Sequence, residues 1–150
     1  MMILIENYGA YQTNKKKNLI NKLGEIRMGL VSIRGAITVE NNNKEEILEA
    51  TQIMLEAILR ENRMDIDNII QIHFSATKDL DTVYPAVAAR NLKITEASLM
   101  CFQELYVVGA LEKCIRADVL VEQEGLTRKN VKHQYLREAK RLRPDLVKEQ

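Results

Sequence analysis

The stretch GLVSIRGAITV, residues 29–39, alternates apolar and polar side chains along most of its length. Successive side chains of a β-strand point to opposite sides, so the two kinds of residue would occupy opposite faces. The apolar face would carry Val31, Ile33, Ile37 and Val39. The polar face would carry Ser32, Arg34 and Thr38. This pattern predicts a β-strand with one buried face, and the compact domain is expected to begin with it.

The residues after this strand predict a helix and a second strand. Asn43 is suited to the N-cap position, and Glu46 three residues later completes a pattern like a capping box. Apolar side chains then recur at helical spacing to about Glu61. IIQIHFSA, residues 69–76, predicts the second strand. Its apolar face is expected to carry Ile70, Ile72 and Phe74.

The second half of the chain predicts a short helix, two more strands and a last helix. PAVAARNL (85–92) suits the helix, and ASLMCF (97–102) and CIRADVLVEQ (114–123) suit the strands. Thr127 is expected to cap the last helix, and Pro144 is expected to end it. The apolar residues of that helix would be Val131, Tyr135, Ala139 and Leu142. The order βαβαββα predicts an α/β (α+β) domain with a mixed sheet and helices packed on one face.

Residues 1–28 differ from the rest, because they are rich in Asn and Lys and show little periodicity. Two interpretations fit this composition equally well. The segment is either a disordered N-terminal tail or the product of an upstream start codon. Both interpretations place it outside the domain that residues 29–150 are expected to form.

Composition limits the class of protein. The 150 residues suit one domain, and 46% hydrophobic with 29% charged residues are enough for a packed core. A formal net charge of +1 argues against broad electrostatic capture of nucleic acid. No apolar run approaches the ~20 residues of a membrane span, and the N-terminus lacks a secretory pattern. The two cysteines match neither a disulfide framework nor a zinc motif, so a reduced, cytoplasmic protein is expected.

Two arginines stand in strands whose alternate residues are apolar. Arg34 and Arg116 each fall on the side of the strand that the apolar residues leave free. One such arginine alone would simply face solvent. Two on separate strands, with Ser32, Thr38 and Asp118 nearby, indicate a polar cleft. Because a guanidinium group holds carboxylates through two hydrogen bonds, the cleft would suit an anion.

The stretch CFQELYVVGALEKCIR, residues 101–116, joins the third strand to the fourth and carries charges close to the expected core. Cys101 and Glu104 are three residues apart, so they converge only if the third strand ends near Cys101. Spacing alone favours a structural cysteine and an exposed glutamate. No suitably placed histidine supports a cysteine nucleophile.

No motif of the chain predicts a metal or a cofactor. His73 and His133 lack metal-ligand spacing, so structural or surface roles are expected for both. The basic run of the last predicted helix suits the helix dipole, and the absence of interleaved aromatic residues makes a nucleic-acid role weak. The sequence has no Gly-rich phosphate loop, HExxH or GxSxG motif.

Four motifs, in order, give the chain a family resemblance. They are SIRGAITVE (32–40), SATKDLDTVYPAVAAR (75–90), CFQELYVVGALEKCIR (101–116) and HQYLREAKRLRPDL (133–146). Their order and spacing resemble those of the trimeric, barrel-like AroH class of chorismate mutase. The resemblance covers about residues 31–146, which is nearly all of the compact domain.

The resemblance implies a fold, an activity and an assembly. The fold would be a pseudo-α/β barrel built by three subunits, with clefts at their interfaces. The activity would be the Claisen rearrangement of chorismate to prephenate, in the branch toward phenylalanine and tyrosine. This pericyclic reaction needs no nucleophile, proton transfer, metal or cofactor. It is helped by a cleft that holds the reactive conformation and by a fixed cation at the developing charge.

The resemblance also implies the residues that act. Arg34 would bind a substrate carboxylate, and Arg116 would approach the ether oxygen whose bond breaks. Glu104 and Cys101 would meet the substrate hydroxyl and ring, and Tyr135 would contact a carboxylate. The neighbouring subunit would supply Tyr84, Ala86 and Arg90. The pocket would further be lined by Leu99, Met100 and Leu142.

The sequence departs from the family pattern at the rim of the implied pocket. Val87 stands where the family often has lysine, and Tyr84 where it often has phenylalanine. Leu99 and Met100 replace smaller residues. Loss of the lysine would affect substrate affinity more than chemistry, since both arginines remain. Two alternatives stay open, an imine deaminase on a similar trimeric scaffold and a non-catalytic metabolite-binding trimer.

Overall fold

The structure is a computed structural model that describes residues 29–147. The expected N-terminal extension, residues 1–28, lies outside the described residues. The strands are β1 (Leu30–Thr38), β2 (Ile69–Ala76), β3 (Ser98–Gln103), β4 (Cys114–Glu122) and β5 (Gln134–Tyr135). The α-helices are α2 (Lys44–Asn62), α3 (Ala86–Asn91) and α4 (Pro144–Val147), and the 3-10 helices are η1 (Ile66–Asn68) and η2 (Arg137–Leu142).

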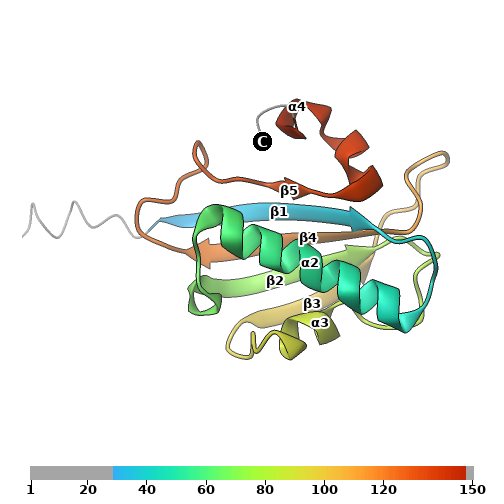
Figure 1. The fold of residues 1–150 in the computed structure, drawn as a ribbon, viewed down its shortest axis with the longest axis horizontal. Helices are drawn as coiled ribbons and strands as arrows, with labels where there is room; N and C mark the ends of the chain where they lie inside the picture. The colour runs from blue at the N-terminus through green and yellow to red at the C-terminus, as the bar shows by residue number, and fades with distance from the viewer. Residues whose placement is uncertain (1–28, 148–150) are drawn as a thin grey trace, which may run out of the picture.

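The strands form one mixed sheet in the order β3-β2-β4-β1-β5 (Figure 1). β4 lies in the middle and pairs antiparallel with both β1 and β2. The outer pairs, β2 with β3 and β1 with β5, are parallel. The predicted mixed sheet is therefore confirmed, and its central strand is the one that carries Arg116.

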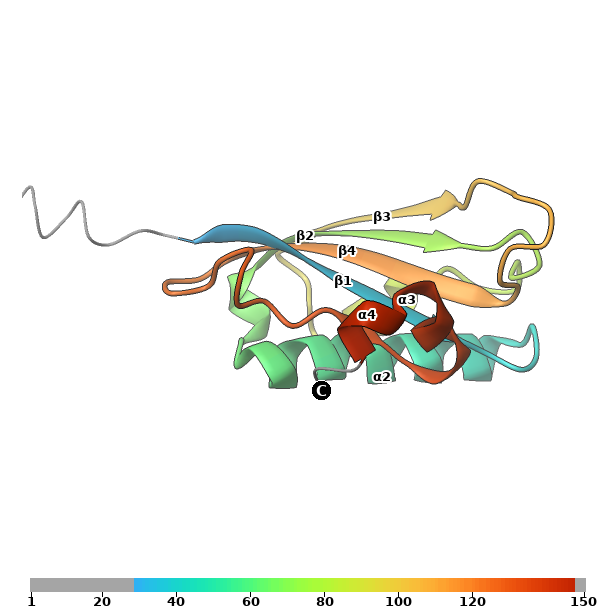
Figure 2. The same cartoon turned by 90° about the horizontal axis from the view of Figure 1, so that it is seen from above.

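Helices α2 and α3 lie on the same face of the sheet, as the sequence predicts, and the core lies between them and the strands (Figure 2). Gly35 of β1 allows α2 to approach closely. A Cβ atom at this position would lie 2.8 Å from side-chain atoms of both Ile58 and Met54. Helices α2 and α3 leave the other face uncovered, and we call it the open face (Figure 2). At its β1 edge, Ala139 of η2 packs with Ala36 and Cys114. None of the helices in residues 29–147 has the length and apolar composition needed to cross a membrane.

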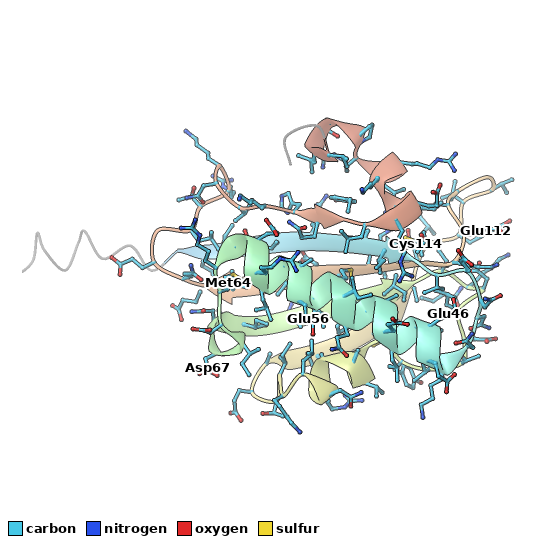
Figure 3. All side chains as sticks on the ribbon, in the orientation of Figure 1. Glu46, Glu56, Met64, Asp67, Glu112 and Cys114 are labelled. Carbon is cyan, nitrogen blue, oxygen red and sulfur yellow. The ribbon has the colours of Figure 1, made fainter. Side chains whose placement is uncertain are left out.

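The start of α2 is fixed by the cap that the sequence predicts. The Asn43 side chain accepts a hydrogen bond of 2.8 Å from the backbone N–H of Glu46. The Glu46 carboxylate in turn accepts the backbone N–H groups of Glu40 and Asn41 and the side-chain amides of Asn41 and Asn43. Figure 3 shows Glu46 at this end of the helix. One carboxylate therefore ties the β1–α2 connection to the first turn of α2.

The prediction that Ile70 shares the buried face of β2 is wrong. Ile72 and Phe74 are fully buried, but Ile70 is 41% exposed and Ile69 takes the inward position. A bulge between Ile69 and Gln71 shifts the register against β4. An extra residue in one strand shifts the inward and outward alternation of the side chains that follow it. Assigning faces by counting every second residue therefore fails across the bulge.

The predicted last helix, from Thr127 to Pro144, is also wrong. Thr127 starts only a single turn, closed by the Val131 N–H at 3.0 Å. The chain then extends into β5, where Tyr135 is buried opposite Ala36 of β1. Helical structure resumes only in η2, and Pro144 begins α4 instead of ending a helix. The unpaired edge of β1 takes these residues as a strand, because its backbone groups need partners.

We expect Glu46 to stabilise the fold in a pH-dependent manner. Hydrogen bonds from the Asn41 side chain and backbone are the main reason that the pKa of Glu46 is lowered to about 2. A carboxyl group with a lowered folded-state pKa stabilises the fold above its unfolded pKa, and this contribution is lost as pH falls toward 2. Glu46→Gln should therefore be less stable than the parent at pH 6, with a difference that shrinks on acidification.

Urea unfolding of parent and variant between pH 6 and pH 3 measures this difference. Glu45→Gln, in the same helical turn, is the matched control because Glu45 takes no part in the cap. An equal loss for Glu46→Gln at every pH, or an equal effect of Glu45→Gln, would contradict the assignment.

Candidate active site

An ion pair joins the ends of β3 and β4 on the open face. Arg116 lies opposite Ala36 of β1 and Ser75 of β2. Glu104 follows β3 directly, and its backbone N–H donates to the Ala76 carbonyl at 2.9 Å. Arg116 Nη2 lies 2.7 Å from Glu104 Oε1. The side chains are 37% and 19% exposed, so the pair is partly sheltered from water.

This ion pair leaves hydrogen-bonding capacity unused. Arg116 Nε and Glu104 Oε2 are both buried atoms without a hydrogen-bond partner among the described residues. Buried polar atoms are nearly always paired, and an unpaired one costs free energy. The pair therefore has one donor and one acceptor that no other described residue satisfies.

A cleft of about 270 Å³ on the open face contains Arg116 and two more of the expected residues, Arg34 and Tyr135. Arg34 comes from the middle of β1, and its side chain is exposed. Tyr135 comes from β5 and is largely buried. Two guanidinium groups and a phenol thus line one hollow, an arrangement suited to carboxylates. The other residues that line it include His73, Ser75, Phe102 and Asp118.

The histidines have structural contacts at this cleft, which fits the roles expected for them. His133 Nδ1 accepts the backbone N–H of Arg34 at 2.9 Å. Burial, followed by the charges of Arg34 and Arg143, lowers the pKa of His133, so the ring stays neutral and can accept. The His73 ring packs edge-on against Phe102, with ring centroids 5.4 Å apart. In residues 29–147 no three His, Cys, Asp or Glu side chains gather as a metal site.

Cys101 does not join Arg116 and Glu104 within this chain. β3 continues past Cys101 to Gln103, so the condition for convergence is not met. Cys101 pairs with buried Phe74 and packs against the core, on the side of the helices. Glu104 falls on the opposite side, beside Arg116. The side chain of Cys101 instead faces a second hollow, of about 520 Å³, which Tyr84 and Pro85 also line.

The other expected residues also lie away from the cleft. Tyr84 is 72% exposed and Arg90 is exposed, at the two ends of the α3 segment, whereas Ala86 is buried. Leu99 packs against the main core, and Met100 is 49% exposed on the open face. Leu142 packs against a small cluster that contains Tyr135. One chain therefore brings together Arg34, Arg116, Glu104 and Tyr135, but not the rest.

Sequence reasoning missed several residues of the cleft. Ser75, His73 and Phe102 point to it from β2 and β3 because they alternate with the buried residues of those strands. This alternation is a signal that could have identified them. Asp118 was noted only as a polar neighbour, and it accepts a hydrogen bond from the Ser32 hydroxyl.

A larger cavity lies elsewhere and has the wrong charge for an anion. It measures about 1140 Å³, between the start of α2, the loop before β4, and η2. Its acidic residues are Glu40, Glu46, Glu49, Glu112 and Glu138. Of its basic residues, Lys113 Nζ donates to the Glu40 carbonyl and Arg137 to the Thr38 carbonyl. The smaller cleft with two arginines is the better anion site.

Known proteins resemble this chain over most of its length. The profile of the family described as chorismate mutase type I matches residues 30–146. The chain is 42% identical over 120 residues to chorismate mutase AroH of Bacillus subtilis, a match that covers 79% of this chain and 94% of the relative. It is 39% identical over 115 residues to chorismate mutase AroH of Thermus thermophilus, covering 76% and 93%. A solved chorismate mutase structure from Clostridium thermocellum is 45% identical, with a TM-score of 0.72, covering 73% of this chain and 97% of its own.

These matches confirm the family resemblance that the four motifs indicate, and they favour it over the imine deaminase and the non-catalytic trimer. They span both strands that carry the arginines and the segment that carries Tyr135. The chain belongs to the chorismate mutase type I family, the AroH class.

Proposed function

We propose that this enzyme rearranges chorismate to prephenate at the cleft around Arg116, in the route to phenylalanine and tyrosine. The activity itself follows from the family. The observation that carries the placement is the Arg116–Glu104 pair, which keeps a buried donor and a buried acceptor unused. Chorismate offers a partner for each, since it has an ether oxygen that accepts and a hydroxyl group that donates.

Arg116 would supply the main catalytic effect. In the rearrangement the ether C–O bond breaks while a new C–C bond forms, and electrons move around a ring of atoms without any proton transfer. Negative charge collects on the ether oxygen as its bond stretches. A guanidinium group held in place by Glu104 stabilises that charge without reorganising, and it cannot lose its proton. Its effect is therefore larger in the transition state than in the bound substrate.

The other residues of the cleft would hold the substrate in the reactive shape. Arg34 and Tyr135 line the same hollow as Arg116 and suit the substrate carboxylates. Glu104 would accept the ring hydroxyl through Oε2 and balance the positive charge. Holding the enolpyruvyl chain over the ring in this way lowers the entropic part of the barrier. None of these roles requires a metal or a cofactor.

We infer that the active site is completed by a neighbouring subunit in a homotrimer. Tyr84 and Arg90 are exposed and lie away from the cleft of their own chain. The open face, which carries the cleft, also has Met100 and Phe102 about half exposed. Apolar side chains exposed beside a cleft favour assembly. Closed symmetry would then bring the α3 segment, Cys101 and Leu99 of one subunit to the cleft of the next.

The proposed setting is the cytoplasm. Both cysteines of the chain are free thiols in the structure, which fits a reducing compartment. Cys101 would pack at the edge of the site and need no special reactivity. We also propose that residues 1–28 lie outside the catalytic domain, because the family match begins at residue 30.

Arg116→Ala should lower kcat sharply with little change in trimer content or Tm. Removing one preorganised donor at a developing oxyanion costs roughly 10²–10³ in kcat, about 3–4 kcal/mol, and a charged donor should reach at least that range. Arg116→Lys should recover only part of the loss, since a point charge lacks the fork geometry. Arg34→Ala should raise KM more than it lowers kcat, because its carboxylate partner is charged throughout. Loss of chorismate absorbance gives both constants.

Arg60→Ala is the matched control for Arg116, since Arg60 is an exposed arginine on α2, far from the cleft. It should leave both constants unchanged. A kcat close to that of the parent in a folded Arg116→Ala trimer would overturn the electrostatic role.

Mixing two impaired variants tests the shared site. Arg90→Ala and Arg116→Ala should each be weakly active, and light scattering should report trimers for both. If the two arginines of a site come from different subunits, random mixed trimers restore about a quarter of the sites. Unfolding and refolding the variants together should therefore recover activity. No recovery in mixed trimers, or a fully active monomer, would refute a site shared between subunits.

Deletion of residues 1–28 should leave kcat, KM and Tm close to those of the full chain. The reason is that a terminal segment outside the packed domain adds little to its stability. Thermal unfolding and the chorismate assay on the shortened chain check this directly. A Tm lower by several degrees or a tenfold loss of kcat would show that the segment contributes to the domain.

A further inference from the structure

We infer that Asp79 is a positioning residue for the Arg116–Glu104 pair, acting through the backbone of Lys113. Asp79 lies in the connection between β2 and α3, and its Oδ2 accepts the backbone N–H of Lys113 at 2.8 Å. Lys113 is the residue immediately before β4, three positions from Arg116. The inference rests on the proposed role of Arg116 and Glu104.

Lys113 has a backbone conformation that needs support. Its φ is +50°, in the left-handed region that residues other than glycine rarely occupy. Such a conformation persists only where surrounding contacts hold it. Three hydrogen bonds hold Lys113 here. Its backbone N–H donates to the Asp79 carboxylate, its carbonyl accepts the Val39 N–H at 3.0 Å, and its Nζ donates to the Glu40 carbonyl at 2.6 Å. Figure 3 labels Glu112 and Cys114, the residues on either side of it.

At the start of β4, hydrogen bonds from the β2–α3 connection take the place of pairing with β2. The pairing of β2 with β4 ends at Ala76 and Ile115, so the residues before Ile115 have no β2 strand beside them. Thr77 takes over, because its Oγ1 accepts the Cys114 N–H and its N–H donates to the Cys114 carbonyl, each at 3.0 Å. Asp79 then holds Lys113, the next residue outward. The β2–α3 connection thus extends the hydrogen bonding of β4 to the residues just before Arg116.

The same connection also holds Glu104. The Glu104 N–H donates to Ala76, the last residue of β2, so Ala76 and Asp79 anchor the two ends of the loop between β3 and β4. Between these anchors the loop is exposed, with Leu105 and Val108 84% and 85% accessible. The relative position of Glu104 and Arg116 is therefore set by these anchors together with the pairing of Arg116 with β1 and β2.

Asp79 lies close to the pair that it positions. It lines a small cavity of about 70 Å³ together with Glu104, and its Oδ1 is buried without a partner in the described part of the chain. Burial raises the pKa of the Cys114 thiol to about 11, opposed by Arg116 and supported by the charges of Glu104 and Asp79. All three charged groups therefore influence the same buried thiol.

The test measures kcat and KM for chorismate in the full-length trimer. Asp79→Ala should lower kcat roughly 10–100-fold, with KM changed less than about threefold, because small misplacements of a catalytic group are costly. Asp79→Asn keeps an oxygen for the Lys113 N–H, so its kcat should stay within about threefold of the parent. Asp81→Ala is the matched control in the same connection, because among residues 29–147 the hydrogen bonds of Asp81 go to Asn42 alone. It should leave kcat unchanged.

A second pair of variants tests whether Asp79 acts by holding the backbone of Lys113 or by stabilising the fold in general. Glycine adopts positive φ without strain, so Lys113→Gly should make Asp79 less important. Asp79→Ala/Lys113→Gly should therefore match Lys113→Gly in kcat within about threefold. This comparison also decides the matter if Asp79→Ala alone does not assemble. A tenfold loss in the double variant would contradict the inference.

The remaining outcomes are equally decisive. A normal kcat in folded Asp79→Ala, beside a large loss in Arg116→Ala, would overturn this inference alone. An Asp79→Asn variant as impaired as Asp79→Ala would show that the hydrogen bond to Lys113 is not what matters, and would overturn it too. A normal kcat in Arg116→Ala would overturn the proposed function, and this inference with it.

Discussion

The ion pair of Arg116 and Glu104 is the interaction on which the account of this enzyme depends. It joins the central strand of the sheet to the end of β3, on the face opposite α2 and α3. A partly buried pair gains from its Coulomb attraction but loses hydration, and it needs its remaining polar atoms satisfied. Here a donor and an acceptor stay unsatisfied. A dianionic substrate with a hydroxyl group would satisfy both atoms. The unsatisfied atoms that make the free enzyme less stable would therefore be the ones that bind the substrate.

The parts of the fold that could be predicted from sequence are those that local physics fixes. Strict alternation identified β1 and placed Arg34 on the open face, and Asn43 with Glu46 identified the start of α2. The parts that failed depend on distant residues. Tyr135 was assigned to a helix, because nothing near it reveals that the edge of β1 would take it as a strand. Ile70 was placed inward, because the bulge is defined only by the register with β4.

The candidate site shows the same division. The alternation of side chains along a strand correctly puts Arg34 and Arg116 on one face of the sheet. It does not indicate the residue at which β3 ends. Glu104 therefore looked like a surface residue until β3 was seen to run on to Gln103. The role proposed for Glu104 comes from the family resemblance. No sequence pattern indicates Asp79, because its proposed role depends on a hydrogen bond to a residue 34 positions away. The role proposed for Arg90, which lies away from the cleft of its own chain, depends on the proposed trimer.

The central claim is that the positive charge of Arg116, and not its shape or its hydrogen bonds alone, accelerates the rearrangement. Replacing Arg116 by citrulline in a semisynthetic protein tests this most directly, because citrulline keeps the length and planar end group but has no charge. The account predicts a fall in kcat of at least about 10²-fold, with the trimer intact and KM much less affected. A citrulline enzyme with a kcat within a few-fold of the parent would contradict the claim.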